Sequence, residues 1–189
     1  QGTFSDVRFD GHTVSATRPL CIDLGGMAKG TAVERSRVLF ARYGIQSALL
    51  DIGGSSQLAI GQKGARPWYV GLRHPRENRV IGRVALKSGE TTATSGDYEH
   101  SYVRDGRRYH HILDPHTGEP TTGTAGVTVL AGDAELAEAA TKALMVAGPA
   151  RFRETCAALG ISDALLITAT GELLATPGMA VRLKQGADL

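Results

Sequence analysis

The sequence is short of the residues that would point to a metal centre, a disulfide framework or a membrane span. Its two cysteines, Cys21 and Cys156, lie far apart and have no cysteine or histidine beside them at metal-ligand spacing. A zinc site and a disulfide framework are therefore not expected. No apolar run approaches the ~20 residues that a membrane-spanning helix needs. The first residues also lack the basic and then apolar pattern of an export signal, but the chain opens on Gln1 rather than Met, so this absence does not locate the protein.

An excess of charge of one sign is also missing. Lysine and arginine number 21 and aspartate and glutamate 19, which gives a formal net charge of +2. Nucleic acids and anionic lipids, which need a strongly basic surface, are therefore not indicated as partners. A small basic cluster of Arg104, Arg107 and Arg108 is expected to be the solvated end of a hairpin. With 189 residues, of which 42% are hydrophobic, residues 1–189 are expected to form a single domain around one core.

Patterns typical of strands outnumber helical ones. Tight hairpins are indicated at 10–11 and 105–106, which are Asp-Gly in both cases. Most strands are joined by short turns, so the sequence predicts an α+β fold with a mixed or antiparallel sheet core and packed helices. Helices are expected within 22–44, at 133–146 with Asp133 as N-cap, and at 150–160. Further strands are expected at 47–61 (two strands around a glycine turn), 68–75, 80–89, 125–132, 163–168, 170–176 and near Val181, with a loop over 91–100.

Two glycine turns could bind an anion. In "DLGGMAKG", residues 23–30, Gly25 and Gly26 are expected to take positive φ and to leave backbone N–H groups free at a helix N-terminus. That geometry suits a pyrophosphate, but the motif matches neither of the common nucleotide-binding fingerprints. A plain strand-to-helix turn accounts for it equally well. The turn "DIGGSSQ", residues 51–57, offers the same choice, with a plain hairpin turn favoured.

The segment "TATSGDYE", residues 92–99, carries several groups that could contact a ligand. Thr94, Ser95, Asp97 and Tyr98 could together bind a sugar, a phosphate or the face of a ring. A polar loop of this composition is also common without any ligand. The segment is therefore a candidate binding loop.

Two adjacent histidines stand ahead of a sharp turn in "YHHILDPHTGEP", residues 109–120. Because side chains alternate along a strand, His110 and His111 should point to opposite faces, so that one can face a pocket and the other water or the core. Asp114 should hydrogen-bond the backbone of the following turn, where Gly118 can take positive φ. A purely structural role remains open for either histidine at this point.

Five motifs, in fixed order and at fixed separations, together resemble the ApbE family of FAD:protein FMN transferases. The resemblance runs from about Cys21 to about Pro177 and covers the C-terminal two-thirds of the family's usual length. It implies an ApbE-like fold and transfer of the FMN half of FAD to a Thr or Ser of an acceptor flavoprotein, with release of AMP and use of magnesium. It also implies an exported or cell-envelope protein. The motifs are "IDLGGMAKG", "ALLDIGG", "TSGDYE", "YHHILDPHTG" and "ALMVAGP".

The resemblance assigns roles to individual residues. His111 is implied as the catalytic group, either as the base that activates the acceptor hydroxyl or as an orienting donor, and its ordinary pKa near ~6.5 suits both roles. His110 falls at a position where the family is permissive. The residues implied to bind FAD are Gly25, Gly26, Lys29, Gly53, Gly54, Thr94, Ser95, Gly96, Asp97, Tyr98 and Asp114.

The sequence departs from the family in its metal site. Counting back from "ALMVAGP", the usual metal-binding Asp and Thr are Glu138 and Lys142 here. An ammonium group cannot ligate Mg²⁺, so a metal held by Glu138 and a backbone carbonyl near Ala28 is in doubt. Glu138 and Lys142 could instead be an ordinary i, i+4 pair on an exposed helix. Thr141 lies about 100° round the helix and is not an obvious replacement.

A second departure is that relatives carry a segment before the equivalent of Gln1. Two functions therefore stay open. One is an active FMN transferase. The other is a flavin-nucleotide-binding protein of the same fold with reduced or lost chemistry.

Overall fold

A six-stranded sheet lies at the centre of the computed structural model, which describes residues 4–185. The strands are β3 (Ala48–Ile52), β4 (Ser56–Ile60), β7 (Thr91–Gly96), β10 (Thr124–Ala131), β11 (Asp163–Thr168) and β12 (Leu173–Ala175). Their order across the sheet is β12-β11-β10-β7-β4-β3, and neighbouring strands pair antiparallel. The predicted α+β class with an antiparallel sheet core is confirmed.

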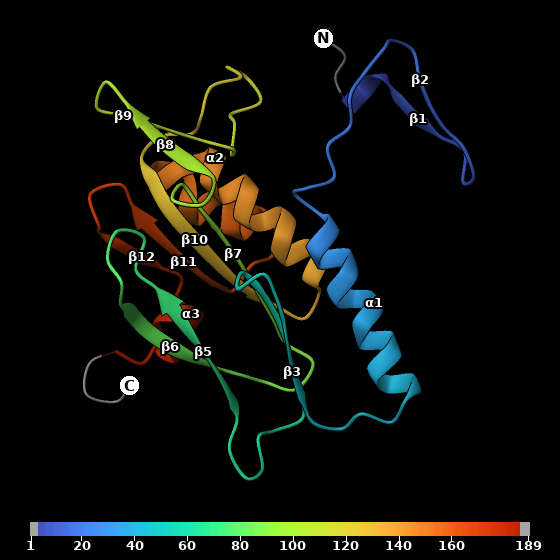
Figure 1. The fold of residues 1–189 in the computed structure, drawn as a ribbon, viewed down its shortest axis with the longest axis vertical. Coiled ribbons are helices and arrows are strands. Elements are labelled where there is room, and N and C mark those ends of the chain that lie inside the picture. Colours follow the sequence, from blue (N-terminus) through green and yellow to red (C-terminus); the bar gives the residue numbers. More distant parts are fainter. Residues whose placement is uncertain (1–3, 186–189) are drawn as a thin grey trace.

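One face of this sheet is covered by the long helix α2 (Ala134–Ala158) (Figure 1). Leu144 and Phe152 of α2 are buried in one cluster with Val127 and Val129 of β10. Burial of such side chains is the main stabilising term of a fold of this size, at roughly 1.5–3 kcal/mol each. The helix therefore has a fixed position over the middle of the sheet.

The start of α2 and its kink follow from individual residues. The side chain of Asp133 accepts hydrogen bonds from the backbone N–H groups of Glu135 and Leu136, at 2.8 and 2.9 Å, so it is the N-cap as predicted. Gly148 takes φ +70° and is followed by Pro149, and this kink divides the two helical stretches that the sequence predicts.

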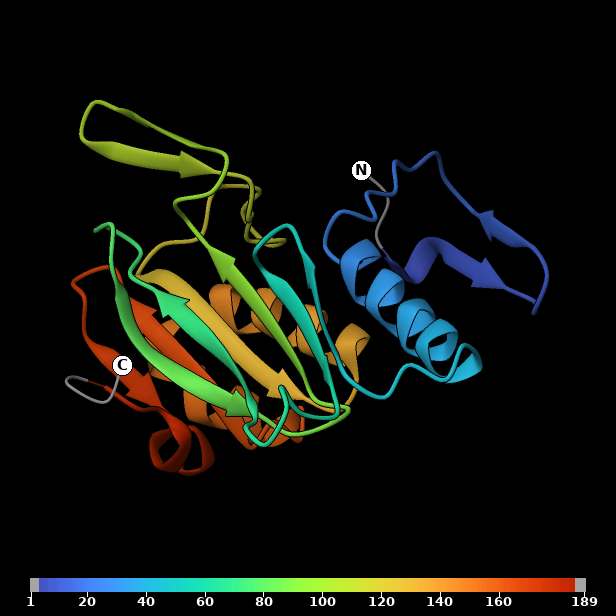
Figure 2. The same ribbon diagram turned by 60° about the horizontal axis from the view of Figure 1, so that its bottom comes forward.

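The other face of the sheet is covered by a two-stranded ribbon of β5 (Trp68–Arg73) and β6 (Val80–Leu86) together with the helix α3 (Pro177–Arg182) (Figure 2). Val84 of the ribbon and Met179 of α3 are fully buried in the cluster on this side. The sheet thus lies between α2 and the ribbon, with an apolar cluster on each face.

The helix α3 corrects one prediction, because a short strand was expected near Val181. Thr176 accepts a hydrogen bond from the backbone N–H of Met179, and Pro177 occupies the first helical position. A threonine cap followed by proline favours a helix start. The apolar run of Met179, Ala180 and Val181 alone does not distinguish a strand from a short helix.

Helix α1 (Ala28–Arg42) lies beside the β3 edge of the sheet and contacts α2 (Figure 1). Val33 of α1 is buried with Leu58 of β4 and Ala134 of α2. A Cβ atom on Gly30 would come within 2.7 Å of the Ala134 carbonyl oxygen. The close crossing of the two helices therefore requires glycine at this position.

The N-terminal part of the described chain forms a separate small hairpin beyond α1 (Figure 2). It consists of a short 3-10 helix (Phe4–Asp6), β1 (Val7–Phe9) and β2 (Val14–Ala16). Asp10 accepts hydrogen bonds from the backbone N–H groups of the turn, which confirms the hairpin predicted at 10–11.

Strand β7 corrects a second prediction, because a loop was expected over 91–100. The strand lies inside the sheet between β4 and β10. Its polar side chains are bonded within the protein: Thr94 Oγ1 lies 3.0 Å from Thr128 Oγ1, and Ser95 Oγ lies 2.8 Å from Thr141 Oγ1. Buried hydroxyl groups with partners are compatible with a central strand. Polarity alone was therefore misleading.

The chain then forms a hairpin of β8 (Ser101–Arg104) and β9 (Arg107–His110), which projects past the sheet (Figure 2). Asp105 and Gly106 take φ values of +51° and +75°, as expected for the turn predicted at 105–106. The hairpin delivers the residues that follow β9 to one end of the sheet.

Both cysteines are free, Cys21 at the surface and Cys156 in the interior. Among residues 4–185 no helix is both long and apolar enough to cross a membrane. The two free cysteines agree with the prediction of no disulfide framework.

Candidate active site

A cavity of about 710 Å³ opens where the turn before α1, the β3–β4 turn, the end of β7 and the residues after β9 meet. Its size is in the range of small-molecule and cofactor sites, roughly 300–1,000 Å³. The structure brings to its wall most of the residues that the sequence predicts for the site. These are Gly25, Gly26, Lys29, Gly53, Gly54, Thr94, Ser95, Gly96, Tyr98 and His111.

Four predicted site residues do not line this cavity. Asp97 and Asp114 bond to neighbouring protein groups, as described below, and Ala28 is the first residue of α1. Glu138 lies behind the wall with 1% of its surface exposed.

The glycine turn before α1 differs from its prediction. Gly25 and Gly26 do not take positive φ. Instead the Asp23 carboxylate accepts a hydrogen bond of 2.7 Å from the Gly25 N–H and so closes the turn. A Cβ atom on Gly26 would lie 3.9 Å from Cε of Lys142. The turn therefore places the backbone of Gly26 directly beside the lysine of α2.

The β3–β4 turn behaves as predicted for a glycine turn. Gly53 and Gly54 take φ values of +64° and +68°. The Gly54 N–H donates to Asp51 at 2.7 Å, and Ser55 Oγ accepts from the Lys29 ammonium group. The turn thus holds the Lys29 ammonium group through Ser55, and the backbone of the turn lies at the cavity wall.

A buried carboxylate with two lysines lies at this end of the cavity. Glu138 accepts hydrogen bonds from Ser56 Oγ on one carboxylate oxygen and from Lys142 Nζ on the other. Lys29 Nζ lies 3.8 Å from the first of these oxygens. Burial lowers the pKa of Lys142, and the bond to Glu138 opposes that shift. The pair is thus not the exposed surface pair considered from the sequence.

Thr141 points away from this cluster, as its position on the helix predicts. Its hydroxyl is fully buried and bonds to Ser95 Oγ and to the carbonyl oxygen of Glu138, each at 2.8 Å. It therefore fixes β7 against α2 and does not reach the cavity.

These residues do not fit a divalent metal. Mg²⁺ needs several oxygen ligands in near-octahedral geometry. Both oxygens of Glu138 already accept hydrogen bonds, one of them from an ammonium group. Within residues 4–185 no three His, Cys, Asp or Glu side chains are grouped closely enough to hold a metal. The arrangement provides positive charge through lysine instead.

His111 also lines the cavity and is solvent-exposed. Its Nδ1 lies 3.2 Å from the carbonyl oxygen of Glu99. A carbonyl oxygen can only accept, so Nδ1 carries the proton and, in the neutral ring, Nε2 carries a free lone pair. Partial burial lowers the pKa of His111, which favours this neutral form. Nε2 can therefore accept a proton.

His110 lies on the other face, as strand alternation predicts. Its ring is buried, Nε2 lies 3.0 Å from the Thr121 carbonyl oxygen, and Nδ1 accepts from the Ile112 N–H at 3.3 Å. Both nitrogens are thus used within the protein. Its role is structural.

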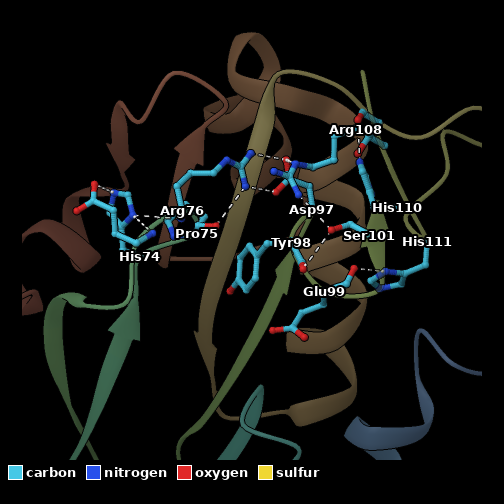
Figure 3. A network of polar contacts seen from close by, with 12 residues as sticks. His74, Pro75, Arg76, Asp97, Tyr98, Glu99, Ser101, Arg108, His110 and His111 are labelled. Atoms are coloured by element: carbon cyan, nitrogen blue, oxygen red, sulfur yellow. Dashed lines mark hydrogen bonds and ion pairs between the residues drawn. The ribbon is translucent and has the colours of Figure 1, made fainter. Parts of the chain in front are cut away.

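Asp97 links its own loop to the loop that carries Arg76, next to Tyr98 (Figure 3). Both of its carboxylate oxygens accept from the guanidinium group of Arg76, at 2.6 Å each, and Arg108 lies 4.0 Å away. The hydrogen bond to Asp97 raises the pKa of Arg76. A Cβ atom on Gly96 would come within 2.2 Å of the Tyr98 ring, so only glycine allows the ring to lie here. Asp97 therefore positions the Tyr98 side of the cavity.

Arg108 departs from the prediction of a solvated hairpin end, because it is half-buried and donates to Ser101 Oγ at 3.1 Å. Arg104 and Arg107 are exposed, as predicted.

Asp114 closes the turn after β9. Its side chain accepts from the His116 N–H at 2.8 Å, and its carbonyl oxygen accepts from the Gly118 N–H at 2.8 Å, with Gly118 at φ +73°. The predicted turn is confirmed. This turn ends the segment that carries His111 at the cavity wall.

The sequence did not indicate several residues at the cavity wall. His100 lies edge-on to His111, with ring centroids 5.6 Å apart, and its φ is +43°. Arg73 of β5 lies 5.8 Å from the Tyr98 ring centroid. His100 directly follows a recognised motif and could have been considered, whereas Arg73 comes from a strand with no local signal. Asp23, Ser55, Gln57, Val70, Gly71, Leu72, Glu99, Ile112, Leu113 and Val146 complete the lining with Lys142.

Comparison with known proteins gives a consistent picture. The model of the ApbE family matches residues 3–166. An FAD:protein FMN transferase of Rhodobacter capsulatus is 40% identical over 181 residues, which cover 95% of this chain and 34% of that protein. An FAD:protein FMN transferase of Treponema pallidum is 33% identical over 189 residues, or 92% of this chain and 51% of that one. The chain thus spans between about a third and a half of these relatives.

Solved structures show the same fold. The ApbE protein of Thermotoga maritima superposes with a TM-score of 0.87 at 34% identity, over 97% of this chain and 60% of that one. The flavinyl transferase ApbE of Pseudomonas stutzeri, in its apo form, gives a TM-score of 0.82 at 30% identity, over 97% and 58%. With a family model over most of its length and two such structural neighbours, the chain belongs to the ApbE family.

Proposed function

We propose that this chain binds FAD and transfers its FMN half to the hydroxyl group of a Thr or Ser in an acceptor flavoprotein, releasing AMP. The observation that carries the proposal is the cavity itself, where two glycine turns, two lysines and the end of β7 face His111. The relatives from Rhodobacter capsulatus and Treponema pallidum, which are FAD:protein FMN transferases, support it. The acceptor flavoprotein, and an exported or cell-envelope location for this chain, are predictions of the family resemblance.

The reaction balances with groups that the chain supplies. The acceptor oxygen forms a bond to the phosphorus of the FMN half, and the P–O bond of the pyrophosphate breaks, so that AMP leaves with the bridging oxygen. His111 Nε2 takes the proton of the attacking hydroxyl group. Because a hydroxyl group is a poor nucleophile near neutral pH, both a base and positive charge near the phosphates are needed.

The remaining cavity residues bind and orient FAD in this proposal. The glycine turns at 25–26 and 53–54 let the backbone approach a pyrophosphate closely. Tyr98, whose pKa is raised by burial and which therefore stays neutral, provides a ring face for stacking. No step of this mechanism passes through a metal ion.

A second function is favoured by the cluster of Glu138 and Lys142. A protein that binds a flavin nucleotide without transferring it would keep the cavity and lose the chemistry. The bonds of Glu138 to Ser56 and Lys142, which occupy both carboxylate oxygens, support this alternative, while the orientation of His111, with Nδ1 toward Glu99, supports transfer. The two can be separated directly.

The test is incubation of the chain with FAD and a flavin-acceptor domain, followed by mass measurement of the acceptor. Transfer predicts an acceptor heavier by the mass of FMN less one water, and an equal amount of AMP. FAD binding without any mass change would establish the alternative. If FAD does not bind at all, both functions are wrong for this chain.

A further inference from the structure

We propose that Lys29 and Lys142, held by the buried carboxylate of Glu138, form a fixed cation site for the pyrophosphate of FAD, so that FAD binding needs no divalent metal. This lysine site rests on the proposed function and specifies how its substrate is held. In this chain, a lysine would then take the place of the metal ion that the family resemblance implies.

The positions of the two lysines are fixed by hydrogen bonds and ion pairs to buried or half-buried groups. Glu138 is 1% exposed and bonds to Ser56 and Lys142, while Lys29 bonds to Ser55 and lies 3.8 Å from Glu138. Burying the Glu138 carboxylate without partners would cost folding free energy. The carboxylate is therefore expected to keep both ammonium groups beside it. The three residues come from α1 and α2, whose close crossing at Gly30 fixes their spacing.

Both lysines remain available to a ligand. Their side chains are 33% and 29% exposed, and both line the cavity. Two ammonium groups against the one carboxylate of Glu138 leave one net positive charge on these three residues. An ion pair that served stability alone would not need to present both cations to the cavity.

The surroundings select a phosphate ligand. Gly26 lies against the stem of Lys142, with only 3.9 Å from its ideal Cβ position to Cε, so that a ligand can reach the backbone and the ammonium group together. The serine and glycine backbone of 53–55 lies beside Lys29. Lysine binds phosphate as a point charge, in combination with backbone N–H groups. A pyrophosphate fits this combination of charge and close backbone approach.

The experiment compares binding of FAD with binding of riboflavin, which has the same ring but no phosphate. Affinities are measured by flavin fluorescence in EDTA and in MgCl₂. For the unmodified chain, FAD affinity should be the same within about twofold in both buffers, and FAD should bind at least about tenfold more tightly than riboflavin.

Two variants sharpen the comparison. Lys142→Thr removes the ammonium group and frees the Glu138 carboxylate, so FAD affinity in EDTA should fall about tenfold or more and MgCl₂ should restore part of it. The double change Glu138→Gln with Lys142→Met removes both charges and leaves no unpaired buried charge. It should lose FAD affinity without any recovery in MgCl₂. Riboflavin affinity should be unchanged in both.

Lys87→Met is the matched control, because Lys87 is exposed and outside the cavity. Circular dichroism and thermal melting show whether each variant is folded, and the neutral double variant keeps the test valid if Lys142→Thr is unstable.

The inference is overturned if EDTA weakens FAD binding to the unmodified chain about tenfold, or if the folded double variant binds FAD normally. In both cases FAD still binds, so the proposed function survives. If neither FAD nor riboflavin binds the unmodified chain, the proposed function fails together with the lysine site.

Discussion

The two ends of the cavity are built in opposite ways. At the lysine end, Lys29, Glu138 and Lys142 are held by buried partners and by two crossing helices. At the histidine end, His100 and His111 are solvent-exposed and follow a projecting hairpin. Binding of a charged group benefits from fixed charge, whereas a macromolecular acceptor needs access to the reacting atom. Under the proposed function, FAD is anchored at the lysine end and the acceptor hydroxyl approaches at the histidine end.

The largest expected effect concerns the lysine end. Gly26→Val adds side-chain atoms between the glycine turn and Lys142; its Cβ atom would be in van der Waals contact with Cε of Lys142, at 3.9 Å, and its two methyl groups would extend into the cavity wall beside it. Because Gly26 does not need positive φ, the chain should still fold, but FAD affinity should fall by about a hundredfold or more. Fluorescence titration with FAD measures it.

Gly132→Val is the matched control, since a Cβ atom there meets open space and its φ is not positive. It should bind FAD normally. Normal FAD binding by folded Gly26→Val would remove this turn from the site.

The second effect concerns the histidine end. His111→Ala should lower FMN transfer by ~100-fold or more, because it removes the group proposed to take the proton of the attacking hydroxyl. FAD affinity should stay within about threefold, since the phosphates are held at the lysine end. Acceptor mass and FAD binding are measured on the same preparation.

His110→Ala separates chemistry from structure. It removes a buried ring that bonds to Thr121 and Ile112, so the melting temperature should fall while transfer per folded molecule stays nearly unchanged. Equal loss of transfer in both variants, at equal stability, would show that His111 acts through the fold.

The predictable parts of the molecule are those with strong local signals. The hairpin turns at 10–11 and 105–106, the cap at Asp133 and the break at Gly148 all depend on backbone preferences of one or two residues, and all were found from the sequence. The opposite directions of His110 and His111 follow from the two-residue period of a strand. Family motifs located most of the cavity wall.

The missed parts depend on partners that are distant in sequence. Ser95 lies in a central strand because Thr141 of α2 satisfies its hydroxyl group, and this partner is 46 residues away. Asp97 was expected at the ligand and instead pairs with Arg76 from another loop. Similarly, Glu138 and Lys142 were considered as an exposed pair, since nothing local shows that β4 and α1 cover Glu138. Tertiary packing decided each case.

A third prediction tests whether the histidine end acts through a neutral imidazole. Partial burial lowers the pKa of His111 below its ordinary value of about 6.5. A base must be unprotonated, so transfer should remain constant down to a pH below about 6.5 and fall only as the pH drops through the lowered pKa. A pH–rate profile at saturating FAD measures the acid limb. A midpoint clearly above 6.5 would contradict the neutral base.

The smallest expected effect connects the two ends. Burial is the main cause of the lowered pKa of His111, and the positive charge of Lys142 adds to it. Removing that charge with Lys142→Thr should therefore raise the pKa of His111 slightly. Titration of the His111 ring signal by NMR, identified by its loss in His111→Ala, measures this shift without any transfer reaction. Histidines outside the cavity serve as internal references, and Lys87→Thr should leave His111 unmoved. An unchanged or lowered pKa in Lys142→Thr would mean that the two ends are electrostatically independent, and that the ammonium group does not face the cavity as the lysine site requires.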